Sequence, residues 1–318
     1  MSPGPAADAK SASAGAMEPE VRSVAAEEVT AILRSEAQPL FGVLDAAQDD
    51  AVLRLLQGGG AEMRSLYNGR RGGNLATIAP YLVALPAGSD LLAALIAEGW
   101  GRNWGIYLSC DEPFDEVRRH LRRFLVVEAE DGASFYFRFY DPRVLRPYLA
   151  ACTPDELDQL FGPIRSLWME GRAVAPADQP GGARPAVELL HYARPRAQVT
   201  TAEPGLPLIR DAQLEVLASE RTEAFVDRMV QRLIYDREHD LGGRPPPDDL
   251  RGTVLAAMQR AAGYGLHRER EQERFIALMG RLGSRFDLEL PWAERTLNRV
   301  NLTPKDKLEA LEKRATGE

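Results

Sequence analysis

Cys110 and His120 are the two side chains whose types and spacing come closest to a catalytic pair. A cysteine becomes a nucleophile when a neighbouring imidazole takes up its proton. Cys110 ends a strand-like run, GIYLSC, and His120 lies on the helical segment that follows. Because spacing alone does not bring the two side chains together, a buried structural cysteine is the favoured interpretation and a thiolate pair is the alternative.

The sequence lacks the other familiar catalytic patterns. It contains four histidines, none of them in an HExxH pattern, and it has no GxSxG elbow, no Walker-type glycine-rich loop and no GxGxxG. The glycine run at 58–60 precedes a strand-like segment, so it lacks the helix N-terminus that a phosphate cradle requires. We therefore single out no catalytic, metal-binding or cofactor-binding residue and predict no cofactor.

The segment 111–123 has its charges sorted along a predicted helix. Acidic residues come first and arginines last, which is the order that complements a helix dipole. The arginines belong to the run RRHLRR and are Arg118, Arg119, Arg122 and Arg123. This cluster either receives an acidic partner or forms a solvated helix end, and the second outcome is the commoner one.

The stretch 135–143, FYFRFYDPR, is unusually rich in aromatic residues. An Asp-Gly step shortly before it favours a tight turn, so we predict a β-hairpin over 124–140. Side chains alternate between the two faces of a strand. This alternation predicts that Phe135, Phe137 and Phe139 share the face that packs in the core.

The opposite face of the same predicted strand carries Tyr136, Arg138 and Tyr140. Rings and guanidinium groups on a sheet can stack on bases, but the Lys/Arg-Gly-aromatic signature of that module is missing and the net charge has the wrong sign for it. The side chains can also cover the core with their apolar parts. We predict that this face is the place to look for a protein partner.

The end of the stretch predicts a change from strand to helix. Asp141 is a strong N-cap and Pro142 suits the first helical position, whereas Pro147 is expected to kink or restart the helix. Arg138, Asp141 and Arg143 are close enough in sequence to share a charge network. We expect these three side chains to brace the corner rather than to contact a ligand.

Two tryptophans, Trp100 and Trp104, lie beside glycines in EGWGRNWGIYL, just before a strand-like run. Tryptophan next to glycine suits a packed corner of the fold. It equally suits a hot spot at which a partner docks. The sequence favours neither alternative.

The order of the predicted elements indicates two domains after an N-terminal tail. Short strand-like runs alternate with helical ones up to about residue 192, which is typical of α/β layers, and the later part has helical periodicity. We predict an α/β domain over 25–203, with a mixed sheet, flanking helices and a β-hairpin. A smaller all-α domain is predicted over 204–318.

Composition narrows the cellular setting and the class of partner. The net charge of −8 lacks the positive field that attracts nucleic acid or anionic lipid. Two cysteines fit neither a disulfide framework nor a zinc site, which indicates a reducing cytoplasm. Residues 1–24 resemble a disordered tail without a signal-peptide core, and no apolar run is long enough to span a membrane. We expect a cytoplasmic protein that binds neither nucleic acid nor a membrane.

Residues 100–164 resemble the adaptor or chaperone domain of bacterial type VI secretion systems. In that family a WG strand, an HLR helix, a hydrophobic hairpin and an FRFYDPRVL corner follow one another in this order. Here WG lies at 104–105, HLR at 120–122 and FRFYDPRVL at 137–145, and FGP follows at 161–163. The resemblance covers roughly 40–170, and the helical part beyond it is similar to an extension that commonly follows this domain.

The resemblance implies a non-catalytic protein of the bacterial cytoplasm that binds a cognate toxic effector, often near the effector's N-terminal region. Such proteins help to load the effector onto the VgrG spike, so the spike is a possible second partner. A cytoplasmic hydrolase that uses Cys110 or an unrecognised acid pair is the alternative.

The residues that we predict to bind a partner or to carry the motif fall into two groups. His120, Arg122, Arg138, Asp141 and Arg143 match recurrent positions of the family, and we expect most of them to hold the corner together. The remaining members are Trp100, Trp104, Tyr136 and Tyr140.

Overall fold

The computed structural model shows a chain that divides into two compact units, Met1–Leu217 and Ala218–Glu318. The division lies within helix α7 (Asp211–Glu238), whereas the sequence suggests a boundary after residue 203. The residues that the structure describes are 17–35, 39–67, 76–173, 187–194, 206–238 and 249–316. Residues 1–16 of the predicted tail and most of a glycine- and proline-rich stretch at 172–186 lie outside these ranges.

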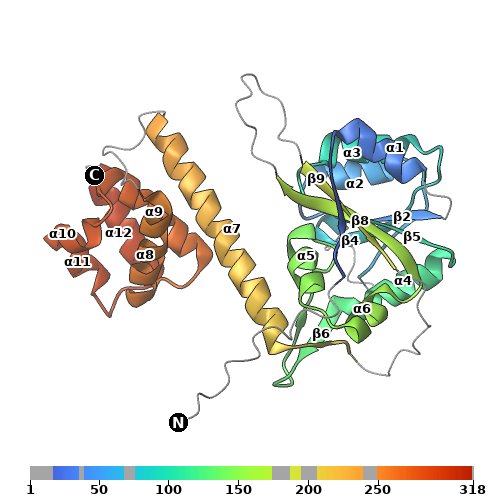
Figure 1. The fold of residues 1–318 in the computed structure, drawn as a ribbon. Helices are drawn as coiled ribbons and strands as arrows, with labels where there is room; N and C mark the ends of the chain where they lie inside the picture. The colour runs from blue at the N-terminus through green and yellow to red at the C-terminus, as the bar shows by residue number, and fades with distance from the viewer. Residues whose placement is uncertain are drawn as a thin grey trace, which may run out of the picture. The chain divides into compact units, whose positions relative to one another are not determined.

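The first unit is built on a seven-stranded sheet with strand order β1-β9-β8-β5-β2-β4-β3, in which all neighbours are antiparallel (Figure 1). Its strands are β1 (Glu20–Val24), β2 (Leu40–Asp45), β3 (Met63–Ser65), β4 (Pro80–Ala84), β5 (Gly105–Cys110), β8 (Ile164–Ala173) and β9 (Val187–Ala193). A second sheet has the order β10-β6-β7, with β10 (Leu208–Ile209) parallel to β6 (Val126–Ala129) and β6 antiparallel to β7 (Ser134–Tyr136). Parallel pairing is thus found in the small sheet and not between the described strands of the large one.

Helices cover both faces of the large sheet (Figure 1). One face carries α1 (Ala26–Arg34), α2 (Asp50–Gly58) and α3 (Asp90–Gly99), and the other carries α4 (Phe114–Arg122), α5 (Pro142–Ala150) and α6 (Pro154–Phe161). Along β2 the side chains alternate, so Leu40 and Leu44 join the core under α1 to α3 while Phe41 and Val43 join the core under α4 to α6. The predicted α/β architecture with flanking helices is confirmed.

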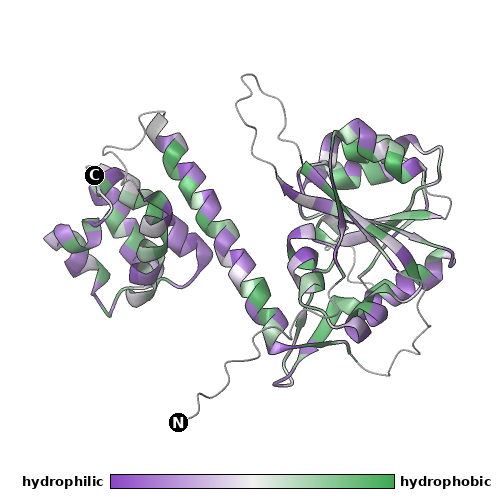
Figure 2. Ribbon diagram, viewed as in Figure 1, coloured by the Kyte–Doolittle hydropathy of each residue, from purple (hydrophilic) through white to green (hydrophobic). Residues whose placement is uncertain are grey.

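Each of these helices has one apolar side, as hydrophobic and hydrophilic segments alternate along them (Figure 2). In α4 the buried residues Phe114, Val117 and Leu121 follow helical spacing, and the arginines lie between them. Burying the apolar side against the sheet therefore leaves the arginines of α4 on the solvent side. Short 3-10 turns at Ala76–Ile78 and Arg123–Leu125 precede β4 and β6.

The hairpin predicted over 124–140 is present but shorter. Its strands are β6 and β7, and Gly132 at the turn has a φ of 82°, a conformation that glycine adopts without strain. Phe137 and Phe139 are buried as predicted, and Phe135 is half-buried at the edge of the core. The strand ends at Tyr136 because the chain then turns into α5, so the prediction that it continues to residue 140 is wrong.

Residues 20–24, predicted as part of a disordered tail, form β1, so the prediction is wrong for this segment. β1 pairs antiparallel with β9, from Glu20 opposite His191 to Val24 opposite Val187. Four of its five side chains are exposed. The hydrogen bonds that make it a strand come from a distant part of the chain, which local composition does not reveal.

The second unit is all-helical in the residues that the structure describes, as predicted. Its helices after α7 are α8 (Leu250–Gly263), α9 (Glu269–Leu282), α10 (Phe286–Glu289), α11 (Pro291–Leu297) and α12 (Pro304–Thr316). On α7, Phe225, Val226, Met229 and Leu233 are buried at helical spacing in the core of this unit. The unit has a core of its own, as a separate domain requires.

Gly105 of β5 provides a test of the packing at the centre of the sheet. A Cβ atom on Gly105 would lie 2.0 Å from the carbonyl oxygen of Val43, whereas one on Gly58, at the end of α2, would meet open space. We expect Gly105→Ala to lower the free energy of unfolding by about 2 kcal/mol or more. Gly58→Ala should leave it unchanged or raise it by up to about 1 kcal/mol. Urea unfolding of the two variants checks this, and equal midpoints would refute it.

Candidate functional site

The corner between β7 and α5 carries most of the motif FRFYDPR. The side chain of Asp141 accepts a hydrogen bond from the backbone N–H of Arg143 at 3.0 Å, and Pro142 is the first residue of the helix, as predicted. Pro147 is buried inside α5, which continues to Ala150. The helix does not restart at this proline, since its ring packs in the core and the loss is confined to one backbone hydrogen bond.

Two buried carboxylates bind two arginines at this corner. Asp141 accepts hydrogen bonds from Nε and Nη2 of Arg143 at 2.9 and 2.7 Å, and it lies 3.8 Å from Arg138. Asp45, the last residue of β2, accepts a short hydrogen bond from Nη2 of Arg138. The side chains of Asp45 and Asp141 are 2% and 4% exposed, and those of Arg138 and Arg143 are 42% and 49% exposed. The predicted network is confirmed, and it gains Asp45, which sequence reasoning missed.

The carboxylates keep both guanidinium groups charged. Burial by itself would lower the pKa of Arg138, but Asp45 and Asp141 outweigh it and hold that pKa above its ordinary value. The hydrogen bond to Asp141 is the main cause of a raised pKa at Arg143. Both carboxylates are already engaged in ion pairs with arginines, so this arrangement suits bracing better than acid–base chemistry.

The tyrosine face predicted for partner binding is only partly accessible. Tyr136 is 43% exposed, and its ring lies edge-on to Tyr67 with the centroids 5.5 Å apart. Tyr140 is 1% exposed and contacts Phe139, so the prediction that it shares a solvent-facing strand face is wrong. The alternation stops because β7 ends at Tyr136, and the turn directs both Phe139 and Tyr140 inward. Burial raises the pKa of Tyr136 and of Tyr140 above their ordinary values.

Trp100 and Trp104 lie in the core on the α1 to α3 side of the sheet, where they are 6% and 3% exposed. Gly99 lies directly against the indole of Trp104, and a Cβ atom there would collide with the ring. These positions match the packed-corner alternative. Neither ring is available to a partner while the loop 100–104 keeps this conformation.

The same loop is fastened by a buried carboxyl group that the sequence gave no reason to single out. Both oxygens of Glu170, on β8, accept the backbone N–H of Asn103 at 3.1 and 3.0 Å, and Asn103 has a φ of 54°. Glu170 is 4% exposed, and burial raises its pKa to about 7, although the backbone N–H groups of Asn103 and Gly101 act in the opposite direction. No local pattern marks Glu170, because its partners come from a loop far away in sequence.

Cys110 and His120 bind different backbone carbonyls instead of each other. Nε2 of His120 donates a hydrogen bond to the carbonyl oxygen of Leu160 at 2.8 Å, and its ring lies against Gly162. The Cys110 thiol donates to the carbonyl oxygen of Pro163 at 3.2 Å. Burial raises the pKa of Cys110 and lowers that of His120. Both effects oppose a thiolate–imidazolium pair.

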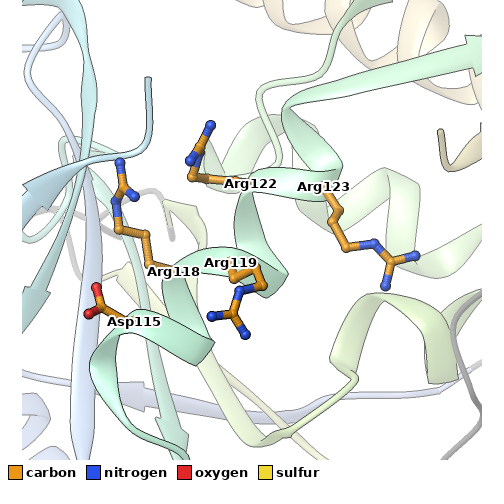
Figure 3. A pocket seen from close by; sticks show the side chains of 5 residues that line it. All are labelled: Asp115, Arg118, Arg119, Arg122 and Arg123. Atoms are coloured by element: carbon orange, nitrogen blue, oxygen red, sulfur yellow. The ribbon is translucent and has the colours of Figure 1, made fainter. Parts of the chain in front are cut away.

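The arginines of the RRHLRR run line an open hollow of about 460 Å³ at the C-terminal end of α4 (Figure 3). Its lining residues are Asp115, Arg118, Arg119, Arg122 and Arg123. Arg118 donates hydrogen bonds from Nε and Nη2 to the carbonyl oxygen of Ser65, at 3.0 and 2.6 Å. The family motif position Arg122 thus belongs to a concentrated positive surface rather than to the corner.

Part of the first unit matches a protein family model. Residues 40–159 match DUF4123, a family model described as a domain of unknown function. The DUF4123 match begins at β2 and reaches into α6, so it includes Asp45, the loop 100–104, the hollow on α4 and the corner at Asp141. No curated protein and no solved structure matches the chain.

The residues that the structure describes hold neither a candidate membrane span nor a candidate metal centre. Within them, no helix is both long and apolar enough to cross a membrane. Within the same ranges, no group of three or more His, Cys, Asp or Glu side chains is placed to hold a metal ion.

The brace at the corner is tested by Arg138→Gln, which removes the cation that binds Asp45. We expect a loss of about 1–3 kcal/mol in the free energy of unfolding, because two buried carboxylates keep fewer compensating partners. The matched control is Arg64→Gln, since Arg64 is 54% exposed and lies 3.6–3.7 Å from Asp115 and Glu62. That change should stay within about 0.5 kcal/mol of wild type. Equal losses for the two variants would contradict a brace at Arg138.

Glu170 predicts a pH dependence of stability. Its pKa in the folded state, about 7, lies above the ordinary 4.5, so folding favours the protonated carboxyl group. The stabilising effect is complete below pH 4.5 and is lost as the pH rises from 4.5 to about 7.

The amide of Glu170→Gln does not titrate, so the stability of this variant relative to wild type should increase over that interval. We expect an increase on the order of 3 kcal/mol. Urea unfolding across the pH range measures it. The exposed Glu27→Gln serves as control, and a parallel pH profile for wild type and Glu170→Gln would exclude a buried acid with a raised pKa.

Proposed function

We propose that this protein is a non-catalytic adaptor of a bacterial type VI secretion system, which binds a cognate toxic effector and helps to load it onto the VgrG spike. The observation that carries the proposal is the DUF4123 match over residues 40–159. The match encloses the WG strand, the HLR helix and the FRFYDPRVL corner, which are the motifs that resemble the adaptor family. The place of action is the bacterial cytoplasm, where effector and spike are made.

The positions of the motif residues support a scaffold rather than a catalytic centre. Asp141 and Arg138 form the brace with Asp45, and Trp104 is buried in the core. A motif that maintains the fold can recur in adaptors with different clients, because the client contacts the exposed side chains instead. We therefore assign effector specificity to exposed positions outside the motif.

The exposed face of the small sheet offers such positions. Val126 and Tyr136 are cross-strand partners on β6 and β7 and are 37% and 43% exposed, and Leu208 on β10 is 50% exposed. The other face of this sheet is buried at Val127 and Ile209. β7 is an edge strand of the sheet, so a client segment can add both apolar contacts and backbone hydrogen bonds there.

The competing hydrolase has weaker support. A nucleophilic cysteine needs a depressed pKa, and burial raises the pKa of Cys110. The two buried aspartates that the fold brings to the corner, Asp45 and Asp141, already bind arginines. Turnover of ester, phosphate or peptide substrates by the purified protein, abolished in Cys110→Ala, would overturn the adaptor proposal in favour of this alternative.

Co-expression with the effector encoded beside this gene tests the adaptor. We expect the effector to co-purify with the wild-type chain, and we expect its solubility and secretion to fall when the adaptor is deleted. An effector that is equally soluble and equally secreted without the adaptor would refute the proposal.

The exposed face of the small sheet is tested separately with Tyr136→Ser. This change should reduce effector affinity by about tenfold or more, because an exposed tyrosine at a contact commonly contributes over 1 kcal/mol. Val21→Ser on β1 is the matched control, since Val21 is 52% exposed and its loss also removes an exposed apolar side chain. Titration of the labelled effector against each variant measures the affinity. An unchanged affinity for Tyr136→Ser, or an equal loss for Val21→Ser, would place the client on another surface.

A further inference from the structure

The hollow at the end of α4 concentrates positive charge on a chain whose net charge is −8. Four arginines within two turns of one chain segment contribute to its lining, and Asp115 is the single acid among the lining residues. In Figure 3, Arg118 and Asp115 lie on one side of the hollow and Arg123 on the other, with Arg119 and Arg122 between them. All four arginines therefore contribute to the lining of one hollow, although their side chains extend in different directions.

Contacts with the rest of the unit hold part of this lining in place. The guanidinium group of Arg118 is fixed by two hydrogen bonds to the carbonyl oxygen of Ser65, and Arg119 pairs with Glu116 one turn earlier. Nε of Arg122 is buried and has no hydrogen-bond partner among the residues that the structure describes. A buried donor without a partner is costly, so the guanidinium group of Arg122 is incompletely compensated by its surroundings.

The arginines also repel one another. Burial is the first cause of a lowered pKa at Arg118, and the nearby charges of Arg122 and Arg64 lower it further. Asp115 acts in the opposite direction, but it also lies 3.6 Å from Arg64. The helix dipole helps the cations to remain at this end of α4. An anion in the hollow would relieve the repulsion that remains.

We propose that the hollow lined by Arg118, Arg119, Arg122 and Arg123 binds an acidic segment of a partner protein through at least two Asp or Glu carboxylates. Planar guanidinium groups bind carboxylates with paired, charge-assisted hydrogen bonds, which suits several arginines lining one hollow. The acidic character of the bound segment is inferred from the arginines that line the hollow. That the partner belongs to effector loading rests on the proposed function.

The surroundings of the hollow favour a peptide over a nucleic acid. Asp111, Glu112, Asp115 and Glu116 occupy the N-terminal half of the same segment and would repel a phosphate backbone passing along it. Nucleic-acid binding depends on neutralising many phosphates along a basic surface. A peptide with a compact group of carboxylates can bind the arginines at the C-terminal end of the helix without passing along its acidic half.

Fluorescence anisotropy with a labelled peptide of alternating glutamate and alanine tests the proposal. We expect wild-type protein to bind this peptide in a salt-dependent manner and to ignore the same peptide with lysine in place of glutamate. Arg122→Gln should weaken Kd by about tenfold, and Arg119→Gln with Arg122→Gln by about a hundredfold, since each removes a charge-assisted contact.

Arg232→Gln is the control for the loss of one positive charge, because Arg232 is 57% exposed and pairs with Asp236 on α7. It should bind the peptide like wild type, and thermal unfolding checks that all variants are folded. The proposal is overturned if wild type does not bind, if the double variant binds equally well, or if inorganic phosphate displaces the peptide at comparable concentrations. Tighter binding of single-stranded DNA of equal charge would also overturn it in favour of a nucleic-acid site.

A parallel effector pull-down separates this inference from the proposed function. Peptide binding without co-purification of the effector would leave the acidic-segment site standing and remove the effector adaptor. Co-purification of the effector without peptide binding would leave the effector adaptor standing and remove the acidic-segment site. If both occur and the double variant loses both, the hollow is part of the effector-loading surface.

Discussion

The ion network in which the buried carboxylates of Asp45 and Asp141 bind Arg138 and Arg143 is the interaction on which the first unit depends. Asp45 ends a central strand of the large sheet, and Asp141 caps α5. The arginines therefore connect the sheet to the start of a helix on its surface. Two buried carboxylates without cations would be strongly destabilising, so the network permits one arrangement of strand, turn and helix and penalises others.

Buried acids are accommodated in two different ways in this unit. At the corner, arginines that are about half-exposed neutralise Asp45 and Asp141 while keeping contact with water. At the loop 100–104, the carboxylate of Glu170 binds backbone N–H groups, and Arg146 donates to the backbone carbonyl oxygen of Glu170 at 2.7 Å. Burial raises the pKa of Glu170 to about 7, because it outweighs the backbone N–H groups and the charges of Arg146 and Arg143, which act in the opposite direction. The loop thus retains a carboxyl group that titrates near neutral pH.

The residues that stabilise the first unit and the residues that a partner could contact are largely different. Several residues that carry the family resemblance are engaged within the unit. Trp104 is buried, His120 binds a backbone carbonyl oxygen, and Asp141 binds Arg143. The exposed face around Tyr136 and the arginine hollow on α4 lie outside these contacts. An adaptor needs a constant scaffold and a surface suited to one client, and the two sets of residues divide in this way except at Arg122, a motif residue that lines the hollow.

Signals that act over a few residues were readable from the sequence alone. Strand alternation predicted the buried Phe137 and Phe139, the Asp-Gly step predicted the hairpin turn, and Asp141-Pro142 predicted the start of α5. Tertiary structure decided what depends on distant partners. Asp45 reached Arg138 across 93 residues, Glu170 reached the loop at Asn103, and β1 became a strand by pairing with β9. The same reason explains the error at Tyr140: alternation holds only while a strand continues, and the turn after Tyr136 is set by how α5 packs on the sheet.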